Sequence, residues 1–428
     1  MNKFGKYQVV EKIAQGGMAE VFMGLAQARD GTHRLVALKR LNLETVQDAH
    51  IVTMFEDEAR VTSRIKHPNI VRTHEFFTDG ENKVLAMEFI PGCDGRTVLE
   101  CAKKRGEYLP ELMALTITRD ICLGLEHAHA MKRSDGSSLG LIHRDISPHN
   151  MLVGYNGKTK IIDFGIVKSE VNLSRTLAGA MKGKFAYMAP EQIMSKAMDH
   201  RVDVFALTAS LFELLTNQRA FEAPNDFAVL EKIRLGEWGP LPPDVSRDPD
   251  TISRIIAKGL ASTPDGRYST VRAFRTDLDQ YIQRNFPAAN GEAMVKEWMR
   301  KNFAPDYANL KRLAQSALQG RSATATPKAT PKERHEVNPP SLHERSNLPP
   351  PPPQVALNEV NLPKDSASST NQLPPNSDAK ADSSLSTPTI SVVASSIDLS
   401  GESDRRAALI GYLLVVVALA IIVWELFL

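Results

Sequence analysis

The sequence predicts an α+β fold followed by a long tail without globular character. Short strand-forming runs separated by glycine turns dominate as far as Phe89. From Gly95 onward, apolar residues recur at helical spacing. Beyond residue 320 the chain is rich in Pro, Ser and Thr, and it ends in an uninterrupted apolar stretch. We therefore expect strands first, helices second, and then a non-globular tail.

Residues 7–39 predict a strand, a glycine turn, a second strand, a loop and a third strand. Gly16 and Gly17 in the turn allow the backbone to approach phosphate oxygens closely, and Val21 after them can cover a base. In isolation, a plain hairpin turn explains these glycines equally well. The apolar strand that ends at Lys39 makes a nucleotide site the stronger interpretation.

A helical pattern opens at Phe55 and is stopped by Pro68. It carries three consecutive acidic residues, Glu56, Asp57 and Glu58. Runs of this kind usually form a solvated helix face, and that alternative stays open for these three.

Residues 141–165 gather two acids and an amide, namely Asp145, Asn150 and Asp163. Strands predicted at 141–142 and 161–162 lead into the loops that carry them, with one hairpin between. Hard oxygen ligands on neighbouring loops suit Mg²⁺, and a further carboxylate can orient a hydroxyl nucleophile. This combination is what phosphoryl transfer requires. The alternative is a charged hairpin without chemistry.

The motifs His143-Arg144-Asp145 with Asn150, and Asp163-Phe164-Gly165, resemble the catalytic core of eukaryotic-type protein kinases. The match is strongest to the bacterial serine/threonine branch and covers residues 7–285. The resemblance implies a bilobal protein-kinase fold, with a mainly β small lobe (7–90) and a mainly α large lobe (91–285). It also implies ATP and Mg²⁺ as cofactors and proteins as substrates.

The resemblance assigns roles to the catalytic residues. Asp145 would orient the substrate hydroxyl, and Asn150 and Asp163 would hold the metal ions. Lys39 would hold the α- and β-phosphates, paired with Glu58, whose spacing to the following His-Pro-Asn fits best. The implied nucleotide pocket comprises Ile13, Ala14, Gly16, Gly17, Val21, Ala37, Lys39, Glu58, Met87, Glu88 and Ile90.

The hinge between the lobes is implied at Met87 to Ile90, where adenine would pair with the backbone of Glu88 and Ile90. Met87 would close the back of the pocket, and simple core packing is compatible with that role.

The glycine loop departs from the family pattern, because Ala14 and Ala19 stand where the first and third glycines are usual. We expect a working but stiffer loop. Two further departures concern substrate binding. Ser147 stands where serine/threonine kinases usually carry Lys, and Lys184 stands where they usually carry Thr. We expect these two to compensate each other, so that adding Ser147→Lys restores part of the activity lost in Lys184→Thr.

The activation segment is implied at residues 163–191, and Thr176, Ser174 and Ser169 are its candidate phosphosites. Arg144 could pair with a phosphate there, since guanidinium matches phosphate oxygens. A fixed structural salt bridge is the alternative for Arg144.

Two structural roles are also implied in the large lobe. Asp203 would cap the backbone of the catalytic loop, and Arg267 would pair with Glu191.

The net charge of +2 gives no indication of nucleic acid as a partner. Three cysteines without a pairing motif fit a reducing compartment. The first residues contain no apolar run of signal-peptide length, so we expect the chain to begin in the cytoplasm.

After the catalytic domain, residues 286–319 predict a helical extension without an assigned function. Residues 320–404 predict a disordered linker, because they cannot bury enough apolar area to offset their ordering entropy. Residues 407–424 carry no charge and would span about 27 Å as a helix, enough to cross a membrane. Arg405 and Arg406 before them favour a C-terminal anchor in the cytoplasmic membrane, with the kinase inside the cell.

The sequence thus predicts a membrane-tethered protein serine/threonine kinase. It would transfer the γ-phosphoryl of Mg-ATP to protein hydroxyls, beginning with its own activation loop through self-association. Two alternatives are a small-molecule kinase of related fold and a catalytically weak, nucleotide-binding pseudokinase scaffold.

Overall fold

The computed structural model describes residues 3–27, 31–42, 45–164 and 185–319. These belong to the compact unit Met1–Arg334. The expected linker (320–404) and the apolar stretch (407–424) lie outside the described residues, as do Ser169, Ser174, Thr176 and Lys184.

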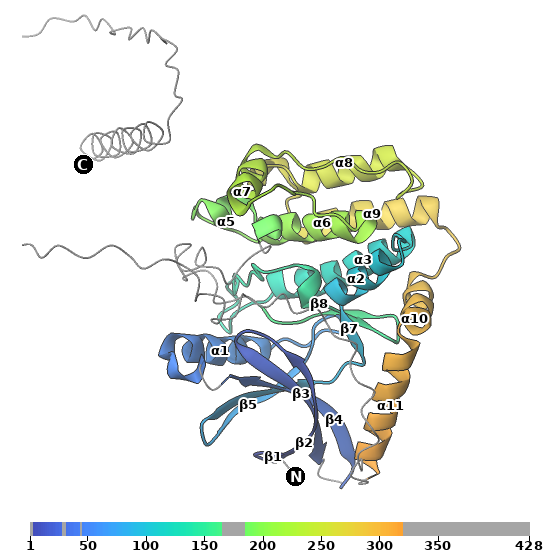
Figure 1. The fold of residues 1–428 in the computed structure, drawn as a ribbon. Coiled ribbons are helices and arrows are strands. Elements are labelled where there is room, and N and C mark those ends of the chain that lie inside the picture. Colours follow the sequence, from blue (N-terminus) through green and yellow to red (C-terminus); the bar gives the residue numbers. More distant parts are fainter. Residues whose placement is uncertain (1–2, 28–30, 43–44, 165–184, 320–428) are drawn as a thin grey trace, which may run out of the picture. The chain divides into compact units, whose positions relative to one another are not determined.

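The small lobe is built on a six-stranded antiparallel sheet with the strand order β1-β2-β3-β4-β6-β5 (Figure 1). Its strands are β1 (Lys3–Phe4), β2 (Tyr7–Gln15), β3 (Ala19–Gln27), β4 (His33–Leu41), β5 (Thr73–Asp79) and β6 (Asn82–Glu88). The strand, glycine turn and strand expected at 7–39 are therefore present. The register sets Lys39 of β4 opposite Val21 of β3 and opposite Leu85 of β6.

Side chains of β4 alternate between two apolar clusters, as the period of a strand requires. Val36 and Leu38 are buried on one face with Tyr7 of β2. Leu41 lies in the other cluster, together with Phe55 of α1. Lys39 shares the face of Leu41, so the register directs it toward α1.

Helix α1 (Ala49–Thr62) covers that second face and follows a short 3-10 turn, η1 (Thr45–Gln47). Its N-terminus is capped by the Asp48 carboxylate, which accepts hydrogen bonds from the backbone N–H groups of His50 and Ile51. Phe55 and Ala59 are its main buried anchors. The helix begins before the point where the apolar pattern becomes visible, because the cap rather than the periodicity sets its start.

The large lobe is mainly helical (Figure 1). Its helices are α2 (Gly95–Lys104), α3 (Glu111–His129), α5 (Pro190–Ile193), α6 (Arg201–Thr216), α7 (Asp226–Leu235), α8 (Pro249–Gly259) and α9 (Val271–Asn285), with 3-10 turns η3 (Phe185–Tyr187) and η4 (Pro264–Gly266). Helix α6 is buried along almost its whole length, and α3 and α9 pack against it. The bilobal fold implied by the resemblance is thus confirmed.

A second, three-stranded sheet supports the catalytic loop. It contains β7 (Gly92–Asp94), β8 (Met151–Gly154) and β9 (Thr159–Ile161), and η2 (Pro148–Asn150) leads into β8. The strand expected at 141–142 is wrong, because this segment is irregular. The backbone N–H groups of His143 and Arg144, just after it, donate to the Asp203 carboxylate instead of to a neighbouring strand.

The extension after α9 forms two helices, α10 (Gly291–Asn302) and α11 (Ala304–Leu318). Val295 and Met299 of α10 are fully buried in the large-lobe core. A side chain at Gly291 would place its Cβ 2.0 Å from the Thr116 hydroxyl, so the helix can approach α3 only because Gly is there.

Helix α11 continues from the large lobe to the small lobe. Near its start, the Tyr307 ring lies edge-on to Tyr155 with the centroids 5.0 Å apart. Its far end lies beside β4 (Figure 1). The extension predicted at 286–319 is thus helical, and it contacts both lobes.

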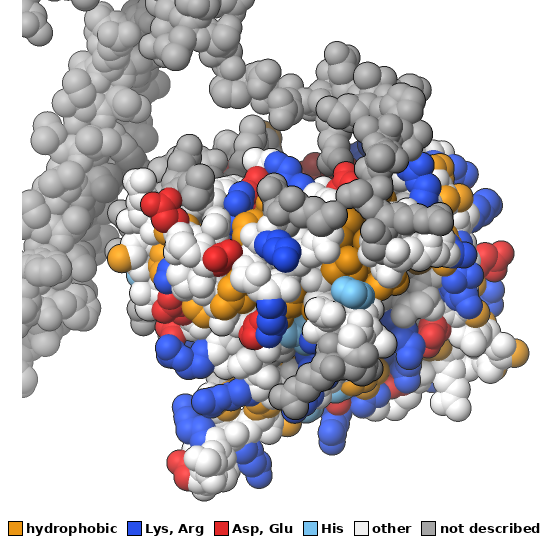
Figure 2. Space-filling model, turned by 90° about the horizontal axis from the view of Figure 1, so that it is seen from below, with side chains coloured by type: hydrophobic (Ala, Val, Ile, Leu, Met, Phe, Trp, Pro, Cys, Tyr) orange, Lys and Arg blue, Asp and Glu red, His pale blue; other side chains and the backbone are white. Residues whose placement is uncertain are grey.

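Seen from the small-lobe end, Lys and Arg side chains form scattered patches, with apolar side chains between them (Figure 2). None of the helices in the described ranges has both the length and the apolar character needed to span a bilayer.

Candidate active site

Lys39 lies at the centre of the candidate site, between two carboxylates from different elements. Its Nζ is 2.6 Å from Oδ1 of Asp163, which follows β9, and 3.7 Å from Oε1 of Glu58 on α1. The register of β4 brings Lys39 to this position.

The three acids of α1 are now distinguished. Oε1 of Glu56 lies 3.4 Å from Nζ of Lys83. Oδ1 of Asp57 lies 2.7 Å from Nη1 of Arg60. Only Glu58 of the three faces Lys39 in the structure. The geometry thus agrees with the pairing that the resemblance implied.

The ammonium of Lys39 is held in its charged form. Burial alone would lower its pKa, but the carboxylates of Asp163 and Glu58 outweigh burial and raise the pKa above its ordinary value. A permanent cation in this position can neutralise phosphate oxygens.

Asp163 stands at a sharp change of backbone direction after β9. Its φ is +51°, in the left-handed region that few non-glycine residues adopt. The next residue, Phe164, is buried, and its ring centroid is 4.7 Å from that of His143. The strained residue therefore points a 39% exposed carboxylate into the site while its neighbour is anchored in the core.

Asp203 of α6 holds the backbone of the catalytic loop in place. Its buried carboxylate accepts hydrogen bonds from the backbone N–H groups of His143 and Arg144, both at 2.8 Å, and it lies 2.7 Å from His129 Nε2. Burial would raise the pKa of Asp203, but the hydrogen bond and charge of His129, with the His143 contacts, lower it overall. The capping role expected for Asp203 is seen directly.

Asn150 orders the loop from within. Its Nδ2 donates to the backbone oxygen of Asp145 at 2.7 Å and to the Asp145 carboxylate Oδ2 at 2.8 Å. These bonds fix the amide so that Oδ1 faces away from Asp145.

The donor set fits a magnesium ion. Asn150 offers the amide Oδ1, and Asp163, whose Oδ1 is taken by Lys39, offers Oδ2. Mg²⁺ prefers such hard oxygens and usually completes its shell with water and substrate phosphates. Asn150 and Asp163 are therefore the residues that would hold it.

The glycine loop is tied to the end of β4. The backbone N–H of Gly16 donates to Ala19 at 2.8 Å, closing the turn. Asn42, just past β4, donates from Nδ2 to the carbonyls of Gly16 and Gly17 at 3.3 and 3.0 Å. This role of Asn42 cannot be predicted from the sequence, since nothing in the strand pattern distinguishes the residue.

The remaining pocket residues take positions around this loop. Ala14 pairs with Val21 across β2 and β3, next to an irregularity in the register, and Ile13 beside it is 43% exposed. Ala37 is buried opposite Met87. Met87 packs on the cluster that includes Phe55, which agrees with the core-packing interpretation.

The hinge carries an ion pair that the sequence does not predict either. Both oxygens of Glu88 lie 2.8 Å from Nζ of Lys160 on β9. The Glu88 backbone N–H donates to the carbonyl of Arg72, and Ile90 is half-buried two residues later. The hinge segment is thus joined to the large lobe by a side chain remote in sequence.

Arg267 and Glu191 form the expected buried pair. The two guanidinium nitrogens lie 2.6 and 2.8 Å from the two carboxylate oxygens. This bidentate contact anchors the start of α5, where the activation segment ends.

Arg144 has a positive φ of 65°. Its buried Nε has no hydrogen-bond partner within the described part of the chain, and no ion pair of its side chain is seen there. The structural salt bridge considered for Arg144 is therefore not formed with any described residue. Ser147, another unusual position, is buried within the catalytic loop, between Asp145 and Asn150.

The arrangement of Lys39, Glu58, Asp163, Asp145 and Asn150 in a bilobal fold is typical of protein kinases. A family model described as a protein kinase domain matches residues 7–278. The chain belongs to this family.

Individual relatives place it in the bacterial branch of eukaryotic-type kinases. It is 37% identical over 310 residues to the tyrosine-protein kinase MasK of Myxococcus xanthus, covering 72% of this chain and 47% of MasK. It is 29% identical over 304 residues to the serine/threonine-protein kinase PrkC of Bacillus subtilis, covering 68% of this chain and 44% of PrkC. It is 30% identical over 274 residues to the serine/threonine-protein kinase PknL of Mycobacterium tuberculosis, covering 64% and 65%.

The chain thus spans about half the length of MasK and PrkC, and slightly under two thirds of PknL.

Proposed function

We propose that this chain is a protein serine/threonine kinase that transfers the γ-phosphoryl group of Mg-ATP to hydroxyl groups of proteins. The observation that carries the proposal is the position of the Lys39 ammonium. Its Nζ lies 2.6 Å from Oδ1 of Asp163 and 3.7 Å from Oε1 of Glu58. This places a cation and a metal-binding carboxylate side by side, next to an Asp145 carboxylate held by Asn150.

The proposed reaction needs little covalent chemistry from the protein. The substrate oxygen attacks the γ-phosphorus, the bond from that phosphorus to the β,γ-bridging oxygen breaks, and ADP leaves. Asp145 orients the hydroxyl and receives its proton. Lys39 neutralises α- and β-phosphate oxygens, and a metal ion, which Asn150 and Asp163 would hold, would supply further positive charge.

Serine and threonine are favoured as acceptors because several relatives, PrkC and PknL among them, carry that name. Tyrosine is the second candidate, for two reasons. MasK is named a tyrosine-protein kinase. In addition, Ser147 occupies the position where serine/threonine kinases usually carry a lysine.

The test incubates the purified chain with Mg-ATP and generic protein substrates, with Asp145→Asn as the control. Phosphate on serine or threonine, absent with the Asp145→Asn variant, is the expected result. Phosphate on tyrosine alone would show that tyrosine, and not serine or threonine, is the acceptor. ATP binding without any transfer would overturn the kinase proposal in favour of the nucleotide-binding scaffold.

We also propose that residues 407–424 anchor the chain in the cytoplasmic membrane and that chains phosphorylate each other on the activation segment. Arg405 and Arg406 before the apolar stretch support the anchor. Fractionation of cells that express the chain with and without residues 407–424 tests it. Loss of membrane association is expected only in the shortened chain.

Mixing active chain with a tagged Asp145→Asn chain tests phosphorylation between molecules. Phosphate on the tagged chain at Thr176, Ser174 or Ser169 is expected. A tagged chain without phosphate there would contradict the proposal.

A further inference from the structure

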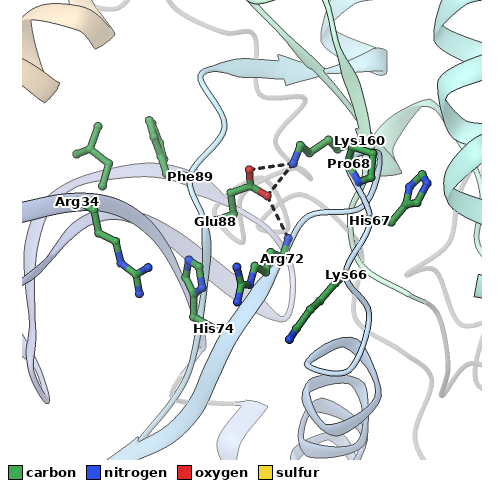
Figure 3. Close-up of a pocket in the computed structure, with 10 residues that line it drawn as sticks. Arg34, Lys66, His67, Pro68, Arg72, His74, Glu88, Phe89 and Lys160 are labelled. Carbon is green, nitrogen blue, oxygen red and sulfur yellow. Dashed lines mark hydrogen bonds and ion pairs between the residues drawn. The ribbon is translucent and has the colours of Figure 1, made fainter. Parts of the chain in front are cut away.

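A cavity of about 510 Å³ lies behind the hinge, away from the catalytic residues (Figure 3). It is lined by β4, the segment between α1 and β5, β5 itself, the end of β6 with the hinge after it, and β9. Its lining residues are Arg34, Leu35, Lys66, His67, Pro68, Arg72, His74, Glu88, Phe89 and Lys160.

The cavity lining is strongly basic. Its four permanent cations, Arg34, Lys66, Arg72 and Lys160, face a single carboxylate, Glu88. Both oxygens of that carboxylate are already engaged by Lys160 at 2.8 Å. The positive charge of the other three cations is therefore not compensated inside the cavity.

Three of these cations have no assigned structural role. Within the described ranges, the side chains of Arg34, Lys66 and Arg72 form neither a hydrogen bond nor an ion pair, and all three residues are exposed. Arg72 contributes only backbone groups to the hinge. They are available to a ligand from solvent.

Arg34 and Arg72 lie on either side of His74. Figure 3 shows the His74 imidazole between the two guanidinium groups. Burial and then the charges of Arg34 and Arg72 lower the pKa of His74, against the opposing effect of Glu88 and Glu75. The imidazole therefore responds to the positive potential at this point of the cavity.

The cavity is much larger than a single phosphate ion, and part of its wall is apolar. Leu35, Pro68 and Phe89 line it beside the cations. This combination suits an anionic group that is part of a larger molecule. The atoms next to the anionic group would then contact the apolar part of the cavity wall. Guanidinium groups match the oxygens of a phosphoryl group in particular.

We propose that this cavity is a second, non-catalytic site that binds a phosphorylated segment of a protein, with Arg34 and Arg72 as its principal phosphate ligands. That the anionic group belongs to a phosphorylated protein rests on the proposed kinase function. That the cavity binds an anionic group rests on the cavity alone. A flat basic surface would suit a lipid headgroup, but these cations line a hollow.

The position of the cavity gives binding a physical consequence. Arg34, Arg72 and His74 belong to the small lobe, Lys160 belongs to the large lobe, and Glu88 lies on the hinge between them. A bound phosphoryl group would attract Lys160 away from Glu88 and add contacts across the hinge. Binding should thus reduce the freedom of the lobes to open.

The test measures binding to the full chain, kept in mild detergent and carrying Asp145→Asn so that it does not modify the probe. The probe is a fluorescent peptide pool with one fixed phosphothreonine and randomised flanks, compared with the same pool carrying threonine. We expect the phosphorylated pool to bind about tenfold or more tightly, as charge-assisted hydrogen bonds predict.

The double variant Arg34→Ala, Arg72→Ala should abolish the difference in affinity between the two peptide pools. The control variant Lys103→Ala, Lys104→Ala removes the same charge from the exposed end of α2 and should leave this difference unchanged. The variant Arg34→Lys, Arg72→Lys should retain part of the difference. Binding of phosphopeptide should also raise the pKa of His74, followed by nuclear magnetic resonance of labelled histidine at constant ionic strength.

Equal binding of the two pools, or unchanged binding in the Arg34→Ala, Arg72→Ala variant, would overturn the proposal. So would stronger Arg34-dependent binding to vesicles containing phosphorylated inositol lipids than to the peptides. Kinase activity is measured separately on the chain with Asp145 intact. Arg34-dependent phosphopeptide binding without phosphoryl transfer would leave this site standing and refute the proposed function.

Discussion

Asn150 donates two hydrogen bonds to one residue, at 2.7 Å to the backbone oxygen and at 2.8 Å to the carboxylate Oδ2 of Asp145. Because Asn150 is buried, these bonds hold the half-buried Asp145 carboxylate in one direction. The same amide would thereby present Oδ1 to a metal ion. One side chain would thus serve two parts of the site.

Asn150→Ala should therefore lower kcat about a hundredfold, because misplacing a catalytic group has effects of this order. Steady-state transfer from ATP to a protein substrate measures it. Asn156→Ala, at the exposed turn after β8, is the matched control and should stay close to the unmodified chain. Similar losses in both variants would refute a specific role for Asn150.

Glu58→Gln should weaken ATP binding and raise the KM for ATP about tenfold, since Lys39 loses one of its two carboxylate partners. Glu56→Gln neutralises an acid two residues away that lies near Lys83 instead, and it should have little effect. Kinetics at varied ATP concentration separate the two. A larger effect from Glu56 would contradict the pairing seen here.

Arg267→Met should lower the free energy of unfolding by about 3–5 kcal/mol, because it leaves the buried Glu191 carboxylate without its partner. Adding Glu191→Met should recover part of the loss, since no buried charge then remains unpaired. Denaturant unfolding of the three variants measures this. Strictly additive losses would show that the two residues act independently.

Asp120→Asn should stabilise the protein above pH 6. Burial raises the pKa of Asp120 to about 6, against a hydrogen bond from the Thr159 backbone N–H at 2.8 Å. The folded state therefore favours the protonated form. The stability that this form contributes is fully present below the ordinary value of 3.8 and is lost as pH rises through 6.

The gain from Asp120→Asn should be about 1–2 kcal/mol at pH 7.5 and should disappear below pH 4. Unfolding curves at a series of pH values measure it. Asp244→Asn removes an exposed carboxylate elsewhere and should show no such trend. A pH-independent effect of Asp120→Asn would exclude titration as the cause.

The order of strands before helices could be predicted because strand and helix periodicities separate cleanly at the hinge, whereas the bilobal fold was implied by the resemblance to protein kinases. Lys39, Asp145, Asn150 and Asp163 could be singled out as candidate site residues, since their motifs are short and local. The segment at 141–142 is irregular, although its apolar residues predict a strand. Its backbone partner, Asp203, lies 60 residues from His143.

Other features were missed for the same reason. Asn42 holds the glycine loop, and Lys160 pairs with Glu88 across 72 residues. The reach of α11 to β4 depends on where α10 packs on α3. Such contacts depend on the folded path of the chain, and single polar residues give no periodic signal.

Helix α11 also has a mechanical consequence. Residue 319, the last one described, follows the end of α11 that lies beside β4, whereas α10 is fixed in the large lobe (Figure 1). A pulling force on the chain beyond that point would reach the domain at the small lobe first. The force would act on the α11–β4 contact before it reached α10, which packs in the large lobe. Tension on the chain after α11 would therefore change the angle between the lobes.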